Sequence, residues 1–340
     1  MVRYTVYCCW VLSIPVTKWR LSKDTRLKYC PSRIHTYFYL SEHWKDYDPF
    51  SRKKQSTIEG SRSAMFQHAR VWSVHHDEFF GTSQQTQFTQ ESEKAELKFF
   101  RFLCKTSLFS EIDSSTKPFS QLSKTSRLLV NDMDQAYNTL KKVRESGKTD
   151  RTVNIILSSA GYELLTDLIL ASFLLRRNFA TRVVLQPSSI PFNMSCTAKD
   201  YESLLDFLAS SHTNDQEFNS DTKLQQERAV RLGEHLRQLQ TQNELVIQPH
   251  NAWHLSTSYW HIPSQHPALF QELQDSELVV FKGDFHYRKL VFDVRNLPSK
   301  SRQSLNTILP SPLLLNPNTY LSFGRHVGLL LPPLRQPSAH

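Results

Sequence analysis

Glycine is scarce in this chain, and the glycine motifs that cradle phosphates are absent. Only 8 of the 340 residues are glycine, and neither GxGxxG nor GxxxxGK followed by Ser or Thr occurs. These motifs bring backbone amides close to phosphate groups in dinucleotide-binding and P-loop proteins. The sequence therefore gives no support to either kind of nucleotide site.

Cysteine pairs and long apolar runs are also missing. The 5 cysteines are irregularly spaced and form no CxxC pair, so neither a disulfide framework nor a zinc or dithiol motif is indicated. No run approaches the roughly 18 apolar residues of a membrane-spanning helix. We therefore expect an intracellular, cytoplasmic protein without membrane contact, although the apolar stretch from Tyr4 to Val16, after Arg3, weakly resembles a signal peptide.

The positive charge is concentrated at one end of the chain. The formal net charge is +9, and residues 1–54 hold 11 Lys and Arg against 4 Asp and Glu. The rest is nearly balanced, and no basic helical stripe or nucleic-acid-binding motif accompanies the surplus. We expect no nucleic-acid partner.

The hydrophobic pattern changes character near residue 147. Apolar residues at helical spacing predict helices between about 57 and 146. Beyond a polar, glycine-containing break, Val153 to Leu157 and Thr181 to Leu185 have the pattern of buried strands on either side of a helix over Tyr162 to Leu175. We predict a mainly helical domain over 1–147, with 1–26 divergent or loosely ordered, and a three-layer Rossmann-like α/β/α domain over 148–335.

The remaining elements of the second domain are predicted from shorter patterns. Lys199 to Ala209 is predicted as an amphipathic helix and Ser210 to Asn243 as a polar insert, helical or partly loose. Glu244 to Ile247 and Leu278 to Phe281 are predicted as strands.

Ligands of open α/β sheets bind beyond the carboxyl ends of the strands, so the residues after each strand are the candidate site. Ser158 to Gly161 follow the first strand and open a helix whose amides could hold an anion. After the second strand, Gln186 leads to the segment Asn193 to Cys196.

The polar block Lys282 to Lys289 follows the last predicted strand. It contains the Lys, Arg, Gly and Asp that suit a phosphorylated ligand, although a turn with a solvated, salt-bridged face is the alternative. We predict a small phosphorylated metabolite as the partner, with these substrate-binding residues: Lys282, Asp284, Phe285, His286, Tyr287 and Arg288. Asp284 is also the candidate catalytic residue.

Two further patterns allow a metal site. Glu163 and Asp167 lie four residues apart on one helix face, where they are either a metal pair or helix-start charges. Four histidines are concentrated in one stretch and could bind zinc if they converge: His250, His254, His261 and His266.

Several blocks resemble the metal-dependent damage-control phosphatases, the family that includes the acidic-residue methyltransferase proteins. Leu278 to Leu290 reads LVVFKGDFHYRKL and is similar to the family signature LVIFKGDLNYRKL. The similarity runs from about residue 27 to 330 and includes three further blocks: WKDYDPF (44–50), AGYELLTDL (160–168), against the family's NxGFELxxDL, and YWHIP (259–263), against YWxxP.

The resemblance implies a helical N-terminal domain beside a Rossmann-like domain. It also implies hydrolysis of sugar phosphates such as fructose 1-phosphate with a divalent cation, Mn²⁺ or Ni²⁺. Methylation of protein carboxyl groups with S-adenosylmethionine is attributed to some members, and nothing in this sequence independently supports it.

The departures from the family pattern fall on its polar site elements. Ser158 and Ser159 stand where the family has the metal ligands Asp and Asn, and Cys196 stands where it has a ligand Asp. Mg²⁺ and Mn²⁺ prefer carboxylate and carbonyl oxygens. Three other elements are altered: ECYxYR aligns with 28–33 and loses its Glu, WGNxxDLS aligns with 103–110 and loses its Asn and Asp, and RTxK is missing near 316–319.

We therefore expect impaired metal-dependent hydrolysis in this copy, which leaves a role in binding a phosphorylated ligand. One alternative is an active or residually active sugar-phosphate phosphatase in which Asp284, with Cys196, still holds a cation. A further alternative is a non-catalytic paralogue that binds a protein, whose identity the sequence does not indicate.

Overall fold

The computed structural model describes residues 37–80, 90–109, 133–209, 220–255, 259–290, 320–323 and 327–330. Residues 1–36, which include the divergent segment 1–26, the signal-peptide-like stretch and the aligned segment 28–33, lie outside this part of the chain, as do residues 316–319. Helices come first, as predicted: α3 (Ser51–Gly60), α4 (Arg62–Val74), the π-helical turn η1 (His76–Phe80), α5 (Gln90–Phe109) and α6 (Met133–Glu145).

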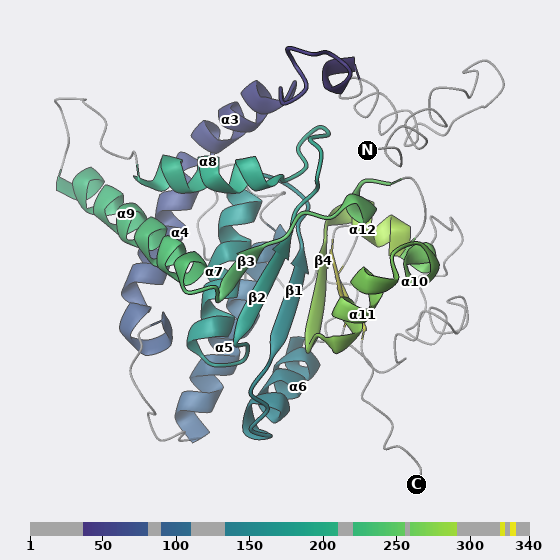
Figure 1. The fold of residues 1–340 in the computed structure, drawn as a ribbon. Coiled ribbons are helices and arrows are strands. Elements are labelled where there is room, and N and C mark those ends of the chain that lie inside the picture. Colours follow the sequence, from purple (N-terminus) through teal and green to yellow (C-terminus); the bar gives the residue numbers. More distant parts are fainter. Residues whose placement is uncertain are drawn as a thin grey trace, which may run out of the picture.

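Strands and helices alternate after residue 150. The elements are β1 (Thr152–Ile156), α7 (Tyr162–Arg176), β2 (Arg182–Gln186), α8 (Ala198–Ala209), α9 (Ser220–Thr241), β3 (Leu245–Ile247), η4 (Asn251–Trp253), η5 (Tyr259–His261), α10 (Ile262–Gln265), α11 (Pro267–Asp275), β4 (Leu278–Lys282), α12 (Gly283–Leu290), β5 (Tyr320–Phe323) and β6 (Val327–Leu330). Among these, β1 to β4 are parallel, whereas β6 runs antiparallel to both β4 and β5. The sheet order is β3-β2-β1-β4-β6-β5. Figure 1 shows β3, β2, β1 and β4 in this order from left to right.

Alternate residues of the central strands face two different hydrophobic clusters. Val153 and Ile155 of β1 belong to the cluster that includes α7, α4 and α5, and Ile156 belongs to a second cluster with Trp253 and Leu269. Successive side chains of a strand point to opposite faces, so helices cover both faces of the sheet. The predicted three-layer α/β/α architecture with an added helical region is confirmed.

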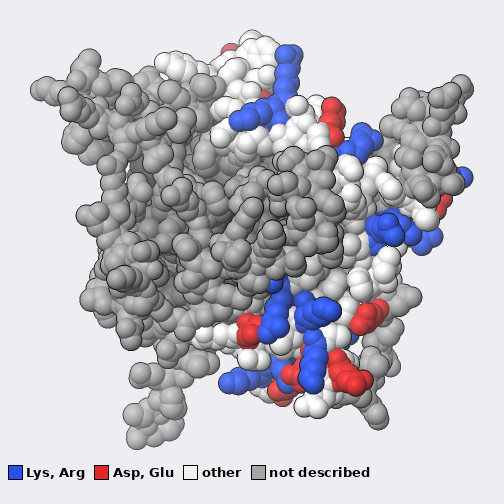
Figure 2. Space-filling view, turned by 180° about the vertical axis from the view of Figure 1, so that it is seen from behind, with Lys and Arg blue, Asp and Glu red and all other residues white. Residues whose placement is uncertain are grey.

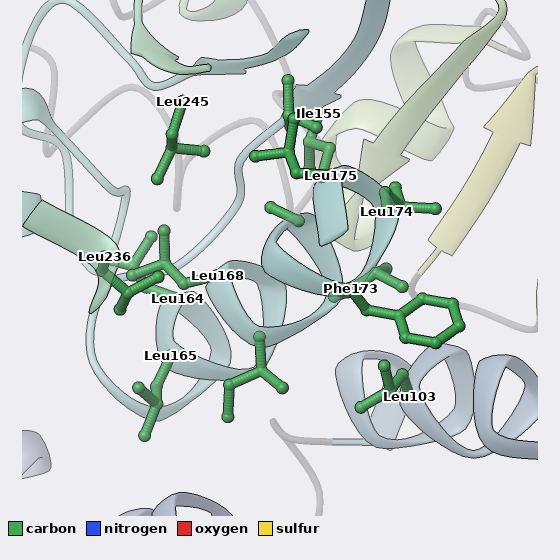
Figure 3. Packing of buried hydrophobic residues seen from close by; sticks show 14 of the residues in the cluster. Leu103, Ile155, Leu164, Leu165, Leu168, Phe173, Leu174, Leu175, Leu236 and Leu245 are labelled. Carbon is green, nitrogen blue, oxygen red and sulfur yellow. The ribbon is translucent and has the colours of Figure 1, made fainter. Parts of the chain in front are cut away.

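Helix α7 is buried along nearly its whole length because it lies between the sheet and other helices. Figure 3 shows side chains of α7, among them Leu164 and Phe173, in one buried cluster with Ile155 of β1, Leu103 of α5 and Leu236 of α9. A helix that is apolar all round belongs in the interior of a protein. The helices before residue 147 thus share one core with the sheet, and the division into two domains stays a prediction.

The polar insert predicted over 210–243 contains a long helix, α9, which packs against α4 and α8. Its fully buried residues recur every three or four positions: Ala229, Leu232, Leu236 and Leu239. Polar residues surround this stripe in the sequence and hide its period. In the described part of the chain, no helix has the length and apolar character needed to cross a membrane.

Charges of both signs are mixed on the described part of one face of the molecule. On the face in Figure 2, the described Lys and Arg side chains lie among Asp and Glu side chains. The expectation that no nucleic acid binds stays a prediction.

Candidate functional site

The chain order of the strands reverses between β1 and β4. From β1 the chain proceeds outward to β2 and β3, and β4 then returns to the other side of β1. Ligands of such sheets bind in the crevice at this reversal, beyond the carboxyl ends of the strands. Ser158 and Ser159 follow β1, and Lys282 ends β4, so these residues lie at the crevice.

Backbone hydrogen bonds bring the loop after β2 to the loop after β1. The amide of Cys196 donates to the carbonyl of Ser158 at 2.9 Å, and the amide of Ala160 donates to the carbonyl of Met194 at 2.9 Å. Ser159 and Ser195 form an antiparallel bridge between these contacts. Ser158 and Ser159 therefore lie next to Cys196, although more than 35 residues of sequence lie between them.

The side chains at these three positions do not fit a hard divalent cation. The Ser158 and Ser159 hydroxyl oxygens lie 3.5 Å apart, and Cys196 is fully buried. Burial, together with the negative charges of Asp200, Asp167 and Glu163, raises the pKa of the Cys196 thiol well above its ordinary value, so the thiol is neutral. Among the described residues, no group of three or more His, Cys, Asp or Glu is placed to hold a metal ion.

Lys282 is buried at the end of β4 in a cluster of polar groups. Its Nζ donates to the carbonyl of Ser107 at 2.5 Å and to the Ser107 hydroxyl at 2.7 Å. The same Nζ lies 3.0 Å from Asp167 Oδ1 and 3.5 Å from Glu163 Oε1. The two carboxylates that were candidates for a metal pair thus face an ammonium group, which joins β4 to α5 and α7.

Ser107 was missed by the sequence analysis. Its hydroxyl donates to Asp167 Oδ1 at 2.6 Å while it accepts from Lys282. It occupies one of the variable positions of the aligned WGNxxDLS element, so no motif marked it. A buried helical serine becomes a site residue here only because the fold brings α5 to β4.

The polar block after β4 is the helix α12, so the alternative of a solvated turn is wrong. Gly283 has φ 82°, which permits the sharp turn from strand to helix. Lys282, His286 and Lys289 are all at least nine-tenths buried. Tertiary partners, rather than solvent, satisfy their polar groups.

His286 is held as a neutral imidazole. Its Nε2 lies 3.1 Å from the carbonyl of Leu157 and therefore carries the hydrogen, while Nδ1 accepts from the Tyr259 hydroxyl. Burial, aided by the positive charge of Lys289, lowers the pKa of His286 to about 3. The ring thus fastens α12 to the end of β1, and its predicted contact with substrate stays a prediction.

The rest of α12 is anchored to two loops. Lys289 Nζ donates to the carbonyls of Ala252 and Leu255 at 3.1 and 2.6 Å and lies 4.3 Å from the centre of the Tyr259 ring. The Phe285 ring lies 5.3 Å from the Phe192 ring in the loop after β2. The side chains of Asp284, Tyr287 and Arg288 are outside the described part, so their assigned roles stay predictions.

The histidine stretch is only partly brought together. The rings of His250 and His266 lie 5.1 Å apart. Neither belongs to a potential metal-binding group of three or more side chains among the described residues. The described geometry therefore gives no support to a zinc site formed by these histidines.

The sequence of this chain is similar to a family model and to several named proteins. A family model described as "Damage-control phosphatase ARMT1-like domain" matches residues 16–315. Damage-control phosphatase ARMT1 of Homo sapiens is 35% identical over 191 residues, which cover 55% of this chain and 40% of that protein. The protein of the same name from Xenopus tropicalis is 29% identical over 295 residues, 84% of this chain and 64% of that protein. The chain thus spans about 40 to 64% of the length of these relatives. Because the family model covers most of the chain, the protein belongs to the ARMT1-like damage-control phosphatase family.

Proposed function

We propose that this chain binds a small phosphorylated metabolite in the crevice between β1 and β4 but has lost efficient metal-dependent hydrolysis. The observation that carries the proposal is the meeting of Ser158, Ser159 and Cys196, which places two hydroxyls and a neutral thiol where the family resemblance implies metal ligands. Compared with the Asp, Asn and Asp that the family has at these three positions, this chain lacks two carboxylate groups.

The missing charges bear directly on catalysis. A divalent cation polarises the phosphoryl group and contributes several kcal/mol to transition-state stabilisation. Lys282 does not replace it, because its ammonium already contacts Ser107, Asp167 and Glu163. The described residues therefore supply no equivalent electrophile.

Binding of a phosphorylated ligand is supported by the family and by the position of Lys282. The relatives are named phosphatases, and Lys282 ends the strand beside the chain reversal. A phosphate would compete with the carboxylates of Asp167 and Glu163 for this ammonium. Fructose 1-phosphate is the probe that the resemblance suggests. No described residue supports methylation of protein carboxyl groups with S-adenosylmethionine, so this activity is not part of the proposed function.

The compartment is part of the same proposal. Cys104 and Cys196 are free thiols in the described structure, and reduced thiols are typical of cytoplasmic proteins. We propose a cytoplasmic location.

A thermal-shift titration of chelator-treated protein tests the binding proposal. A ligand that binds only the folded state stabilises it by about 2.7 kcal/mol at one hundred times its Kd, which raises the Tm by several degrees. We expect fructose 1-phosphate to raise the Tm without metal, and Mn²⁺, Ni²⁺ or Mg²⁺ to add nothing. Fructose without phosphate is the matched control ligand.

Two outcomes would replace the proposal by an alternative. Substantial metal-dependent turnover of fructose 1-phosphate or fructose 6-phosphate, abolished by Asp284→Asn, would establish an active phosphatase. A Tm that responds to neither sugar phosphate nor metal would contradict ligand binding and favour the protein-binding alternative.

A further inference from the structure

Helix α3 contacts both loops that form the crevice, and one buried lysine makes the central contact. We propose that Lys54 is a positioning residue that holds the loop over 193–197, and with it Cys196, against the loop after β1. The inference deepens the proposed function, because it assumes that this crevice is the ligand site. Its contacts and its test do not depend on whether a phosphate binds.

Lys54 is a buried cation shared by two carboxylates. The residue is 2% exposed, and its Nζ lies 2.8 Å from Asp48 Oδ2 and 2.7 Å from Asp200 Oδ2. An ammonium group is stable in such surroundings only when it is paired. Asp48 belongs to the segment WKDYDPF, which resembles the family but had no assigned role. Its structural role here is to supply one of the two counter-charges.

Asp200 transmits this contact to the residue next to Cys196. Thr197 donates to Asp200 Oδ2 through its amide at 2.8 Å and through its hydroxyl at 2.7 Å. The Asp200 amide donates back to the Thr197 hydroxyl at 3.4 Å. This is a capping box at the start of α8. One carboxylate oxygen thus accepts from both Lys54 and Thr197.

The neighbouring lysine makes a second, more exposed contact with the same loop. Lys53 Nζ donates to Asn193 Oδ1 at 2.8 Å. Asn193 has φ 50°, a left-handed conformation that asparagine tolerates better than most residues. Lys53 therefore offers a matched control, since it lies next to Lys54 and contacts the same loop from the surface.

On the other side, α3 contacts the loop after β1. Ile58 Cγ1 lies 3.4 Å from where a Cβ atom on Gly161 would be, and Gly161 has φ 83°. The segments 158–160 and 194–196 also hydrogen-bond to each other. Helix α3 therefore holds together two loops that belong to different strands, and the charge of Lys54 is the buried part of that attachment.

The two buried cysteines make the proposal measurable. Cys196 lies in the positioned loop, and Cys104 lies in another element, helix α5; both are buried free thiols. Alkylation by N-ethylmaleimide, with each cysteine quantified through its own peptide, reports how often each region opens. In the whole 340-residue chain with Lys54→Met, we expect alkylation of Cys196 to accelerate at least tenfold while that of Cys104 is unchanged. Lys54→Arg is expected to restore most of the protection, and Lys53→Met to change the rate less than threefold.

Two results would overturn the proposal. One is an unchanged alkylation rate of Cys196, and the other is an equal acceleration of both cysteines, which would make Lys54 a general stability residue. If Lys54→Met does not fold, Lys54→Met combined with Asp48→Asn removes one of the two carboxylates left without a counter-charge, keeps the contact between Asp200 and Thr197, and is judged by the same two rates. Because no ligand or metal is added, failure here leaves the test of phosphate binding untouched, and failure of that test leaves this one untouched.

Discussion

The triple variant Ser158→Asp, Ser159→Asn, Cys196→Asp is expected to hydrolyse fructose 1-phosphate with Mn²⁺ at least about a hundredfold faster than the natural sequence. The substitutions place carboxylate and amide oxygens on two loops that the backbone already holds together. A metal contributes several kcal/mol to phosphoryl transfer, and each 1.4 kcal/mol corresponds to a tenfold change in rate. The measurement is release of inorganic phosphate with and without Mn²⁺.

A variant with asparagine at all three positions is the matched control. It has side chains of nearly the same size but no added charge, so it is expected to remain inactive. The idea fails if the natural sequence turns over substrate as fast as the triple variant, or if the asparagine control gains as much activity.

Glu96→Gln is expected to destabilise the protein by about 3–5 kcal/mol at pH 7, the usual cost of removing one partner of a buried ion pair. Glu96 is fully buried. Its Oε1 lies 2.7 Å from Arg177 Nε and 3.1 Å from Arg144 Nη1, and its Oε2 accepts from the Tyr137 hydroxyl at 2.8 Å. The substitution leaves two guanidinium groups without this counter-charge, where α5 and α6 meet the end of α7. Urea unfolding measures the loss.

The pH dependence of the same variant gives a second readout. Burial alone would raise the pKa of Glu96, but hydrogen bonds and charges from Arg144 and Arg177 outweigh it and lower the pKa below 4.5. The unfolded chain then binds more protons than the folded one, so the contribution of Glu96 is complete above the unfolded pKa and is lost as the pH falls through the folded pKa. Stability of the natural sequence should therefore fall below about pH 4.5 more steeply than that of Glu96→Gln.

Glu93→Gln is the control on the same helix. Glu93 pairs with Lys141, but its side chain is 38% exposed, and exposed ion pairs contribute about 1 kcal/mol or less. An equal loss of stability in the two variants would show that the burial of Glu96 is not what makes its ion pairs important.

Where nearly every residue of an element is buried, the sequence predicted the element well. The run Val153 to Leu157 and the apolar stretch that became α7 were identified because nearly every residue in them is buried. Helix α9 was less clear because its apolar stripe is set among polar residues. Helix α12 was open to interpretation as a turn because its glycine and charged residues follow a strand, a pattern typical of turns.

The polar contacts of the site could not be predicted in the same way. Lys282 bonds to Ser107 across 175 positions of sequence, and Lys54 bonds to Asp200 across 146. No local period or spacing relates such residues. The positions of Ser158, Ser159 and Cys196 came from the family resemblance, whereas their adjacency came from the backbone of two loops.

Equilibrium dialysis against Mn²⁺ tests the loss of the metal site most directly. At a Mn²⁺ concentration at which the triple variant binds close to one ion per chain, the natural sequence is predicted to bind far less than one. Binding of one Mn²⁺ per chain by the natural sequence, lost on Asp284→Asn, would contradict the account and show that the crevice still holds its cation.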